Sequence, residues 1–391
     1  MASSHSASKM AVVRRLLLPL LLVGVLAAGL TGCLATQGDT SKVVKLSSVT
    51  KDGYVWDYYR NEAYPCSVSG YQTFVVGRKV GSSSTATAPM WVFMHGGGVG
   101  SFSASGQPLP NANRMDEESR TELLGHVTND GLSAKVRDAG YRIVSVSMCS
   151  HDLYGGMNTA DPNNPNTTPD GKRRPTTGLI SAKAAIQFAL ATYPTDDYFV
   201  GGGSAGSAGT FHVAWALQQQ GIAPAGIVPD ASVLNQDYYR AAAEQGVCVG
   251  DQEASIKTGL LDRIHPEVAK PENQPHLLVA RGALTVPILH VWNRGDTNTC
   301  GDVPMQCPVG DTTVTLGSTE CAHRPLTLAI AALGPDSRSK NLPLCVEGPD
   351  ATTACDKHVV TPIDGVSTLP GSPADYNAAI WDWIQERRAD D

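Results

Sequence analysis

The sequence predicts an α/β fold in which helices cover both faces of a mostly parallel sheet. Apolar segments typical of buried strands alternate with helical patterns along most of the 391 residues, and this alternation indicates βαβ units. A turn of glycine, serine and alanine at 201–207 separates an apolar run from a helical segment. A second glycine run, at 96–98, follows another apolar run. Tight turns at strand ends are where scaffolds of this class present functional groups.

The first part of the fold predicts antiparallel β-structure. Residues 43–80 contain aromatic and β-branched runs at 54–59 and 70–77, and glycines punctuate them. The later strands are short apolar runs, as expected for strands buried on both faces. These runs lie at 91–94, 141–148, 198–200, 225–230 and 286–292.

Helical patterns separate these strands. The pattern at 113–139 is broken near 129–131, where Asn, Asp and Gly favour a turn. Apolar residues recur at helical spacing in the C-terminal segment 373–388. The other expected helices lie at 177–192, 208–218 and 326–333. Residues 152–175 predict a long loop, and long loops in compact domains are often functional.

A leader precedes this fold. Arg14 and Arg15 are followed by the apolar run 16–28, which is too short for a comfortable membrane span. The tetrapeptide Leu-Thr-Gly-Cys at 30–33 resembles the lipobox of bacterial lipoproteins. That resemblance implies cleavage before Cys33 and lipidation of Cys33, and so an anchor at the outer face of the cell membrane, in the cell envelope. A plain secretory signal is the alternative.

We therefore expect three segments in the chain. Residues 1–32 form a lipoprotein signal peptide, residues 33–47 a polar tether, and residues 48–391 a catalytic domain with a lid-like insertion at about 236–285. The 37 acidic residues slightly outnumber the 30 basic ones, which gives no support to nucleic-acid binding. We expect a monomer whose partners are its substrate and, through Cys33, a membrane.

The cysteines predict disulfides. Of nine cysteines, eight remain when Cys33 is set aside, and an even number in an exported chain favours disulfide bonds. Cys345–Cys355 is the first candidate pair because of its short spacing, and Cys66–Cys149 is the second. A zinc site is the competing interpretation, but the cysteines at 300 and 307 lack the tight spacing that such sites favour.

Residues 202–206 read Gly-Gly-Ser-Ala-Gly and match the G-x-S-x-G pattern. With a strand before and a helix after, this is the context of the nucleophile elbow of α/β-hydrolases. The turn is strained, so residues packed around its serine must lack side chains. We expect Ser204 to be a nucleophile. The alternative is a glycine-rich turn without chemistry.

The tetrapeptide His-Gly-Gly-Gly at 95–98 has the form of an oxyanion loop. In such a loop, backbone N–H groups stabilise the oxygen that becomes negative during acyl transfer. The expected donors are the N–H groups of Gly97 and Gly98, together with that of Ala205, which follows the serine. An ordinary glycine turn that closes a strand is the alternative.

A serine nucleophile needs a histidine base, which in this fold comes late in the chain. His212 lies on the helix behind the elbow and His290 inside a strand, so both are expected to be structural. The histidines at 265 and 276 fall in the lid-like insertion. Of the remaining two, His323 and His358, the second is preferred because it precedes the terminal helix.

The acid that orients the histidine should follow a late strand. Asp296 comes after a strand and a glycine turn, and it is the first candidate. Asp230, at the end of the preceding strand, is the runner-up because some hydrolases carry the acid there. Asp356 lies only two residues from His358, which makes its carboxylate hard to aim at Nδ1.

Four blocks give the chain a resemblance to the pectin acetylesterase and Notum-type carboxylesterases. Residues 148–155 resemble that family's C-S-x-D-x-x-x-G, with the glycine one residue early, and residues 202–206 resemble its elbow. Residues 290–296 resemble its strand-and-acid block. Residues 354–358 resemble its A-C-x-x-H, whose histidine is the catalytic base. The oxyanion loop departs from the family's E-G-G and looks like that of hormone-sensitive-lipase-type esterases, so substrate specificity does not follow from the resemblance.

The expected function is a serine hydrolase of carboxylic esters, with acetyl or other short acyl groups on a polysaccharide or a small molecule as substrates. Ser204 would attack, His358 would transfer the proton and Asp296 would orient His358, without any metal ion or organic cofactor. The alternatives are a polyester depolymerase or peptidase on the same scaffold, or a catalytically silent, ligand-binding surface lipoprotein.

Overall fold

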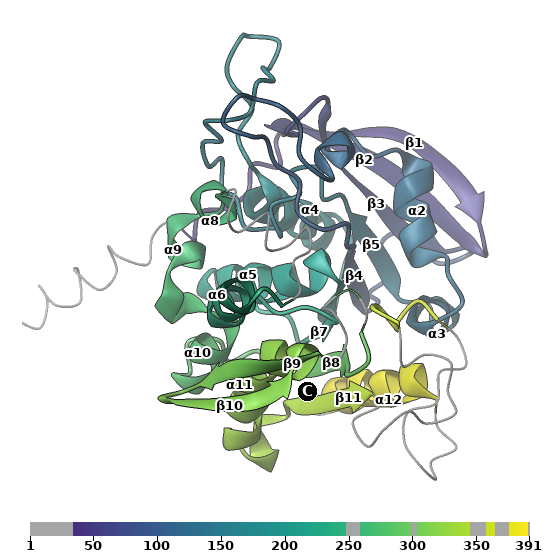
Figure 1. Cartoon of the computed structure of the whole chain (residues 1–391). Coiled ribbons are helices and arrows are strands. Elements are labelled where there is room, and N and C mark those ends of the chain that lie inside the picture. Colours follow the sequence, from purple (N-terminus) through teal and green to yellow (C-terminus); the bar gives the residue numbers. More distant parts are fainter. Residues whose placement is uncertain are drawn as a thin grey trace, which may run out of the picture.

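The computed structural model describes residues 34–247, 259–296, 298, 303–344, 357–363 and 375–389. They form a nine-stranded sheet flanked by helices and a separate two-stranded hairpin (Figure 1). The strands are β1 (Val43–Lys51), β2 (Tyr54–Pro65), β3 (Tyr71–Lys79), β4 (Met90–Met94), β5 (Arg142–Val146), β6 (Tyr198–Gly203), β7 (Gly226–Asp230), β8 (Leu289–Asn293), β9 (Pro304–Val309), β10 (Thr312–Gly317) and β11 (Lys340–Leu344). The α-helices are α2 (Arg120–Val127), α3 (Leu132–Asp138), α4 (Gly178–Thr192), α5 (Ala205–Gln219), α6 (Gln236–Gln245), α8 (Leu260–Arg263), α9 (Pro266–Ala269), α10 (Pro275–Ala280), α11 (Ser318–Ala332) and α12 (Tyr376–Ala389).

The sheet has the order β1-β2-β3-β5-β4-β6-β7-β8-β11. Strands β1, β2, β3 and β5 pair antiparallel in that order, and from β5 to β11 all neighbours are parallel. The carboxyl ends of the parallel strands therefore lie at one edge of the sheet, where this class of fold builds its sites. This is the α/β-hydrolase fold, as the sequence predicts.

Helices cover both faces of the sheet because residues along each strand alternate between two cores. In β4, Met90, Val92 and Met94 belong to one hydrophobic cluster, while Trp91 and Phe93 belong to the other. Helices α4 and α5 contribute to the first cluster. Helices α2, α3 and α12 contribute to the second (Figure 1). Strands buried on both faces explain why the parallel strands read as continuous apolar runs.

Most expected elements are present, with some differences in detail. The pattern at 113–139 divides into α2 and α3 near its Asn-Asp-Gly turn, as expected, but α2 begins only at Arg120, where Ser119 caps it in a capping box with Glu122. Helix α11 begins earlier than residue 326 and contains Pro325. The hairpin β9–β10 and the edge strand β11 were not predicted, because their sequences lack a long apolar run.

The described residues between β7 and β8 include several short helices, where the sequence predicts the insertion at about 236–285. They are α6, α8, α9 and α10, with a 3-10 turn η2 (Pro271–Asn273) between the last two. Within the described part of the chain, no helix combines the length and the apolar character that crossing a membrane requires.

The first described residues, which belong to the segment predicted as a polar tether at 33–47, lie against the body of the fold. Leu34 is only 2% exposed and belongs to the core that α4 and α5 share. The ammonium of Lys183, on α4, donates hydrogen bonds to the carbonyls of Leu34 (2.5 Å) and Thr36 (2.7 Å). Burial lowers the pKa of Lys183 to about 8. Residues 34–42 are therefore docked, and β1 follows at Val43.

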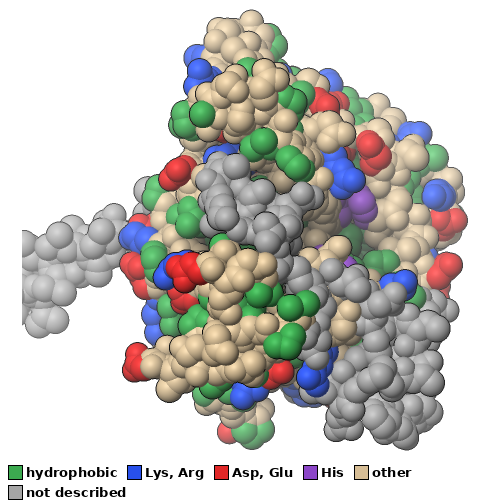
Figure 2. Space-filling model, viewed as in Figure 1, with side chains coloured by type: hydrophobic (Ala, Val, Ile, Leu, Met, Phe, Trp, Pro, Cys, Tyr) green, Lys and Arg blue, Asp and Glu red, His purple; other side chains and the backbone are tan. Residues whose placement is uncertain are grey.

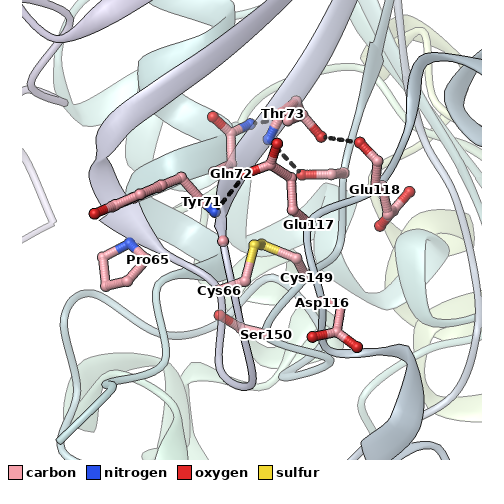
Figure 3. The surroundings of a disulfide bond; sticks show 12 residues. Pro65, Cys66, Tyr71, Gln72, Thr73, Asp116, Glu117, Glu118, Cys149 and Ser150 are labelled. Atoms are coloured by element: carbon pink, nitrogen blue, oxygen red, sulfur yellow. Dashed lines mark hydrogen bonds between the residues drawn. A yellow bond between two sulfur atoms is a disulfide. The ribbon is translucent and has the colours of Figure 1, made fainter. Parts of the chain in front are cut away.

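Two disulfide bonds are described. The expected bond Cys66–Cys149 ties the end of β2 to the residues that follow β5 (Figure 3). The bond Cys307–Cys321, which was not predicted, links β9 to α11 and removes Cys307 from any zinc site. The pair expected first, Cys345–Cys355, lies outside the described residues. Disulfide bonds of this kind persist in oxidising compartments outside the cytoplasm.

Candidate active site

The elbow after β6 holds Ser204 in a strained conformation. Its φ of 54° and ψ of −123° lie outside the regions that residues other than glycine favour, and α5 begins at the next residue. A Cβ atom at Gly202 would collide with the Gly206 backbone, and one at Gly206 would collide with the Met94 carbonyl. The glycines of the motif therefore follow from close backbone packing, and the strained turn exposes the hydroxyl at the sheet edge.

The structure brings Ser204, His358 and Asp296 into one hydrogen-bonded array. The Ser204 hydroxyl lies 2.8 Å from His358 Nε2, and His358 Nδ1 lies 2.6 Å from Asp296 Oδ2. The Asp296 side chain is 1% exposed and that of His358 14%, so the site is open at the histidine and closed at the acid. A neutral His358 with its proton on Nδ1 satisfies both bonds, because Nδ1–H donates to the carboxylate and Nε2 accepts from the hydroxyl.

Asp230, the runner-up for the acid, has a different set of partners. Its Oδ2 accepts hydrogen bonds from the backbone N–H groups of Val360 (3.0 Å) and Thr361 (2.8 Å). Burial raises the pKa of Asp230 to about 6, although these hydrogen bonds oppose the shift. The carboxylate therefore holds the segment just after His358, and the geometry selects Asp296 as the group that contacts the imidazole.

Asn293 supports the same segment from the other side. Its side-chain amide donates to the carbonyl of Lys357 at 3.0 Å, directly before His358. Its carbonyl oxygen accepts from the N–H of Gly295 in the turn that leads to Asp296. One residue at the end of β8 thus connects the acid loop to the histidine loop. Asn293 belongs to the acid block at 290–296, but no role was predicted for it.

The oxyanion loop follows β4 and packs directly against the elbow. A Cβ atom at Gly96 would lie 2.6 Å from the Ser204 Cβ, and Gly98 has a φ of 74°, so both positions require glycine. Among the described residues, no backbone acceptor bonds the N–H groups of Gly97, Gly98 or Ala205. Unpaired donors next to a nucleophile are what an oxyanion hole needs.

A buried ion pair holds this loop. His95 Nδ1 bonds the Gly96 carbonyl at 2.7 Å, and Nε2 lies 2.9 Å from the Glu118 carboxylate, which also accepts from the N–H of Met148. Burial opposes the charged form of His95, but the Glu118 carboxylate outweighs it and raises the pKa of His95. Burial likewise opposes ionised Glu118, and the imidazolium lowers its pKa below the ordinary value. Glu118 was not predicted, because in the sequence it is only an acidic residue directly before a capping box.

His126 completes a group of possible metal ligands with His95 and Glu118. The two imidazole rings, however, stack with centroids 4.1 Å apart and planes 5° from parallel. A metal ion lies in the plane of each imidazole that binds it, and two parallel planes do not meet. The arrangement is therefore not a metal site. Burial and the neighbouring His95 lower the pKa of His126 to about 3, so the stack pairs a neutral ring with a charged one.

Among the described histidines that follow Ser204 in the chain, His358 is the one that forms a hydrogen bond to its hydroxyl. His212 is buried on α5, and neither ring nitrogen has a hydrogen-bond partner among the described residues. His290 Nε2 and His323 Nδ1 bond each other at 2.9 Å in the core. His265 caps α9, and the pKa of His276 is lowered by burial. Histidine side chains are visible in a hollow of the face shown in Figure 2.

The loop after β5 connects the oxyanion loop to the disulfide and to α4. Asp152 is fully buried and accepts from the N–H groups of Gly156 (3.0 Å) and Gly178 (2.9 Å), at the start of α4. A Cβ atom at Gly97 would lie 2.8 Å from a ring carbon of His151. Burial raises the pKa of Asp152, against the effect of its backbone donors. The block at 148–155 is therefore a structural support of the oxyanion loop.

Comparisons with known proteins find similar structures but no similar sequence family. No protein-family model and no curated protein sequence matches the chain. The chain is similar in structure to the Wnt deacylase Notum from Drosophila, with 14% identity over 88% of this chain and 94% of that one, at a TM-score of 0.49. It is also similar to a bacterial brefeldin A esterase described as a homologue of human hormone-sensitive lipase (15% identity, 84% and 77% coverage, TM-score 0.39). Fungal esterases from Rhizomucor miehei show 14% identity, 99% and 94% coverage and a TM-score of 0.41. These structural neighbours are described as a deacylase and as esterases.

Proposed function

We propose that this chain is a serine hydrolase that cleaves carboxylic esters. The observation that carries the proposal is the continuous array of Ser204, His358 and Asp296 at the carboxyl edge of the sheet. His358 Nε2 takes the hydroxyl proton while Ser204 Oγ attacks the acyl carbon. It then gives that proton to the departing alcohol. A water molecule hydrolyses the acyl-enzyme by the same proton transfers, and Asp296 stabilises the imidazolium in both halves.

The negative oxygen of each tetrahedral intermediate is stabilised by the N–H groups of Gly97, Gly98 and Ala205. Loss of one such donor typically costs about 10²–10³ in kcat, so each of these N–H groups contributes substantially to the rate. The His95–Glu118 pair fixes the loop before substrate arrives, and preorganised donors of this kind need no reorganisation during the reaction.

The sequence blocks support a place near the pectin acetylesterase and Notum-type carboxylesterases. Because the oxyanion loop departs from that family's, short acyl groups as substrates are a separate proposal that does not rest on the resemblance. A peptidase or polyester depolymerase could use the same array, because the chemistry of acyl transfer is shared. A silent, ligand-binding protein has no need of the strained elbow or of the array, which makes it the weakest of the three alternatives.

We also propose that the protein is an exported lipoprotein, anchored through Cys33. The lipobox-like sequence at 30–33 supports this, and the Cys66–Cys149 bond fits an oxidising compartment. The leader itself lies outside the described residues.

The experiment is labelling with a fluorophosphonate probe, together with hydrolysis of p-nitrophenyl acetate, for the wild type, Ser204→Ala and Ser207→Ala. Ser207 is the matched control, because it lies one turn further along α5 and its hydroxyl bonds the Ser232 carbonyl at 2.7 Å. We expect Ser204→Ala to lose labelling and on the order of 10⁶ in kcat, and Ser207→Ala to keep both. Equal activity of Ser204→Ala and wild type would remove Ser204 from the mechanism.

A further inference from the structure

A small cavity opens beside the nucleophile. Its walls include Ala205, the residue directly after Ser204, and Ala208, one turn further along α5. Val99, which directly follows the glycines of the oxyanion loop, forms another wall. The cavity thus lies between the two chain segments that carry the oxyanion donors.

The far walls come from three other segments of the chain. They are Leu153 in the loop after β5, Tyr239 on α6 and Leu260 on α8. Ser232 is the only other wall residue among those described. The hydroxyl groups of Ser232 and Tyr239 are the two polar side-chain groups of these walls. The lining is therefore largely apolar, which suits a hydrocarbon group.

The cavity is small. The volume of the cavity is about 10 Å³, which is room for about one water molecule or one methyl group. A longer acyl chain that extends toward the far walls would press against Leu153, Tyr239 or Leu260. Leu153 and Leu260 are 8% and 2% exposed and pack in the main core, so displacing them would disturb that core.

Two features make these walls rigid. The φ angles of His151, Leu153 and Tyr154 are 43°, 56° and 54°, and such strain in non-glycine residues persists only where the surroundings impose it. Helix α8, which carries Leu260, is held by a buried ion pair between Arg263 Nε and Asp161 at 2.8 Å, with side chains 4% and 1% exposed. Arg263 also bonds the carbonyl of Gly100 in the segment that follows the oxyanion loop.

The position of the cavity indicates which part of an ester it receives. The carbonyl oxygen contacts the donors of the loop and of Ala205, and the alcohol must leave next to His358 Nε2, which protonates it. His358 is not a wall of the cavity, whereas Ala205 and Val99 are. The group in the cavity is therefore the one attached to the acyl carbon on the side away from the leaving alcohol.

We propose that this cavity is the acyl pocket and that Leu153, Tyr239 and Leu260 limit the enzyme to acetyl and similarly short acyl esters. The inference rests on the proposed function and adds the residues that set its substrate class. In the reaction, the acyl group is transferred to Ser204 Oγ as the bond to the alcohol breaks, and only the acyl part must fit the pocket.

The experiment measures kcat/KM of the full chain for p-nitrophenyl acetate, butyrate and hexanoate. The wild type is compared with Leu153→Ala and Leu260→Ala, which enlarge the cavity. Leu278→Ala is the matched control, because Leu278 is fully buried in the same core but is not a wall of the cavity.

Methylenes that a pocket cannot accept cost about 10-fold or more each, so we expect the wild type to prefer acetate to butyrate, which has two more methylenes, by at least about 100-fold. The two wall variants should reduce this ratio at least about tenfold. Leu278→Ala should leave it unchanged.

Wild-type enzyme that cleaves hexanoate as fast as acetate would overturn the acyl pocket and leave the proposed function intact. Failure of every ester, together with no fluorophosphonate labelling of Ser204, would instead reject the function. If the wall variants do not fold, labelling of the wild type by methyl-, butyl- and hexylphosphonofluoridates decides the matter. Rates that fall steeply with chain length support the pocket, and equal rates overturn it.

Discussion

Replacement of Asp296 by asparagine tests the array most sharply, because the structure predicts which way the new amide will face. Oδ1 of Asp296 accepts the backbone N–H of Asn298 at 2.8 Å, and Oδ2 faces His358 Nδ1 at 2.6 Å. The backbone donor cannot change, so the amide oxygen of Asp296→Asn stays with Asn298. The amide nitrogen then faces the imidazole.

An N–H donor opposite Nδ1 forces the imidazole proton onto Nε2. A protonated Nε2 can no longer accept the hydroxyl proton of Ser204. We expect kcat to fall by roughly 10⁴, which corresponds to about 5.5 kcal/mol of transition-state stabilisation. The protein should stay folded, because volume and most hydrogen bonds are preserved.

Asp230→Asn is the matched comparison. The amide oxygen of this variant can still accept from the N–H groups of Val360 and Thr361, and the position makes no bond to His358. We expect kcat within about tenfold of the wild type, since a misplacement well under ~1 Å costs less than about 10²-fold. The assay is steady-state hydrolysis of p-nitrophenyl acetate, with thermal unfolding of each variant as the control. A larger loss for Asp230→Asn than for Asp296→Asn would refute the reasoning.

The remaining predictions concern the charge beside the elbow, the oxyanion loop and the anchor. The folded-state pKa of Asp230 is raised to about 6, so the contribution of Asp230 to stability falls as pH rises from about 4 to 6. Relative to Asp230→Asn, the wild type should lose roughly 3 kcal/mol of unfolding free energy over that range. Urea unfolding that gives the same pH dependence of this free energy for both proteins would contradict the prediction. Glu118→Gln should lower kcat about 10- to 100-fold with little change in KM, whereas Glu117→Gln, next to it and bonded to the N–H of Tyr71, should not; equal kinetics of the two would exclude the ion pair from loop positioning. Cys33→Ser should release active enzyme from membranes or leave it unprocessed, and a correctly processed variant that stays membrane-bound in cell fractionation would disprove lipidation there.

Much of the site could be predicted because its chemistry lies in short motifs whose backbone demands are local. The strained turn at Ser204 needs glycines at fixed offsets, and the loop at 95–98 needs a backbone without side chains, so both leave a sequence pattern. The order of nucleophile, acid and histidine along the chain then selected His358 and preferred Asp296 to Asp230. The alternating strands and helices predicted the parallel sheet for the same reason, since burial on both faces leaves an apolar run.

The groups that support the site could not be predicted, because their partners are distant in the chain and their residue types are ordinary. Glu118 meets His95 across 23 residues, and Asn293 meets Lys357 across 64. Neither position carries a periodic signal. The Cys307–Cys321 bond was missed because eight cysteines allow many pairings and sequence spacing alone does not rank them.

The docked segment at residues 34–42 has a consequence for how the enzyme would meet its surroundings. Leu34 is buried, and the ammonium of Lys183 donates a hydrogen bond to its carbonyl. If Cys33 carries the proposed acyl anchor, a single peptide unit of about 3.5 Å would join that anchor to the docked residue Leu34. The anchor would then have no flexible spacer. The catalytic domain would then lie at the bilayer in one fixed orientation, because no flexible spacer would let it move away. Its substrates would be limited to esters that diffuse to the membrane surface.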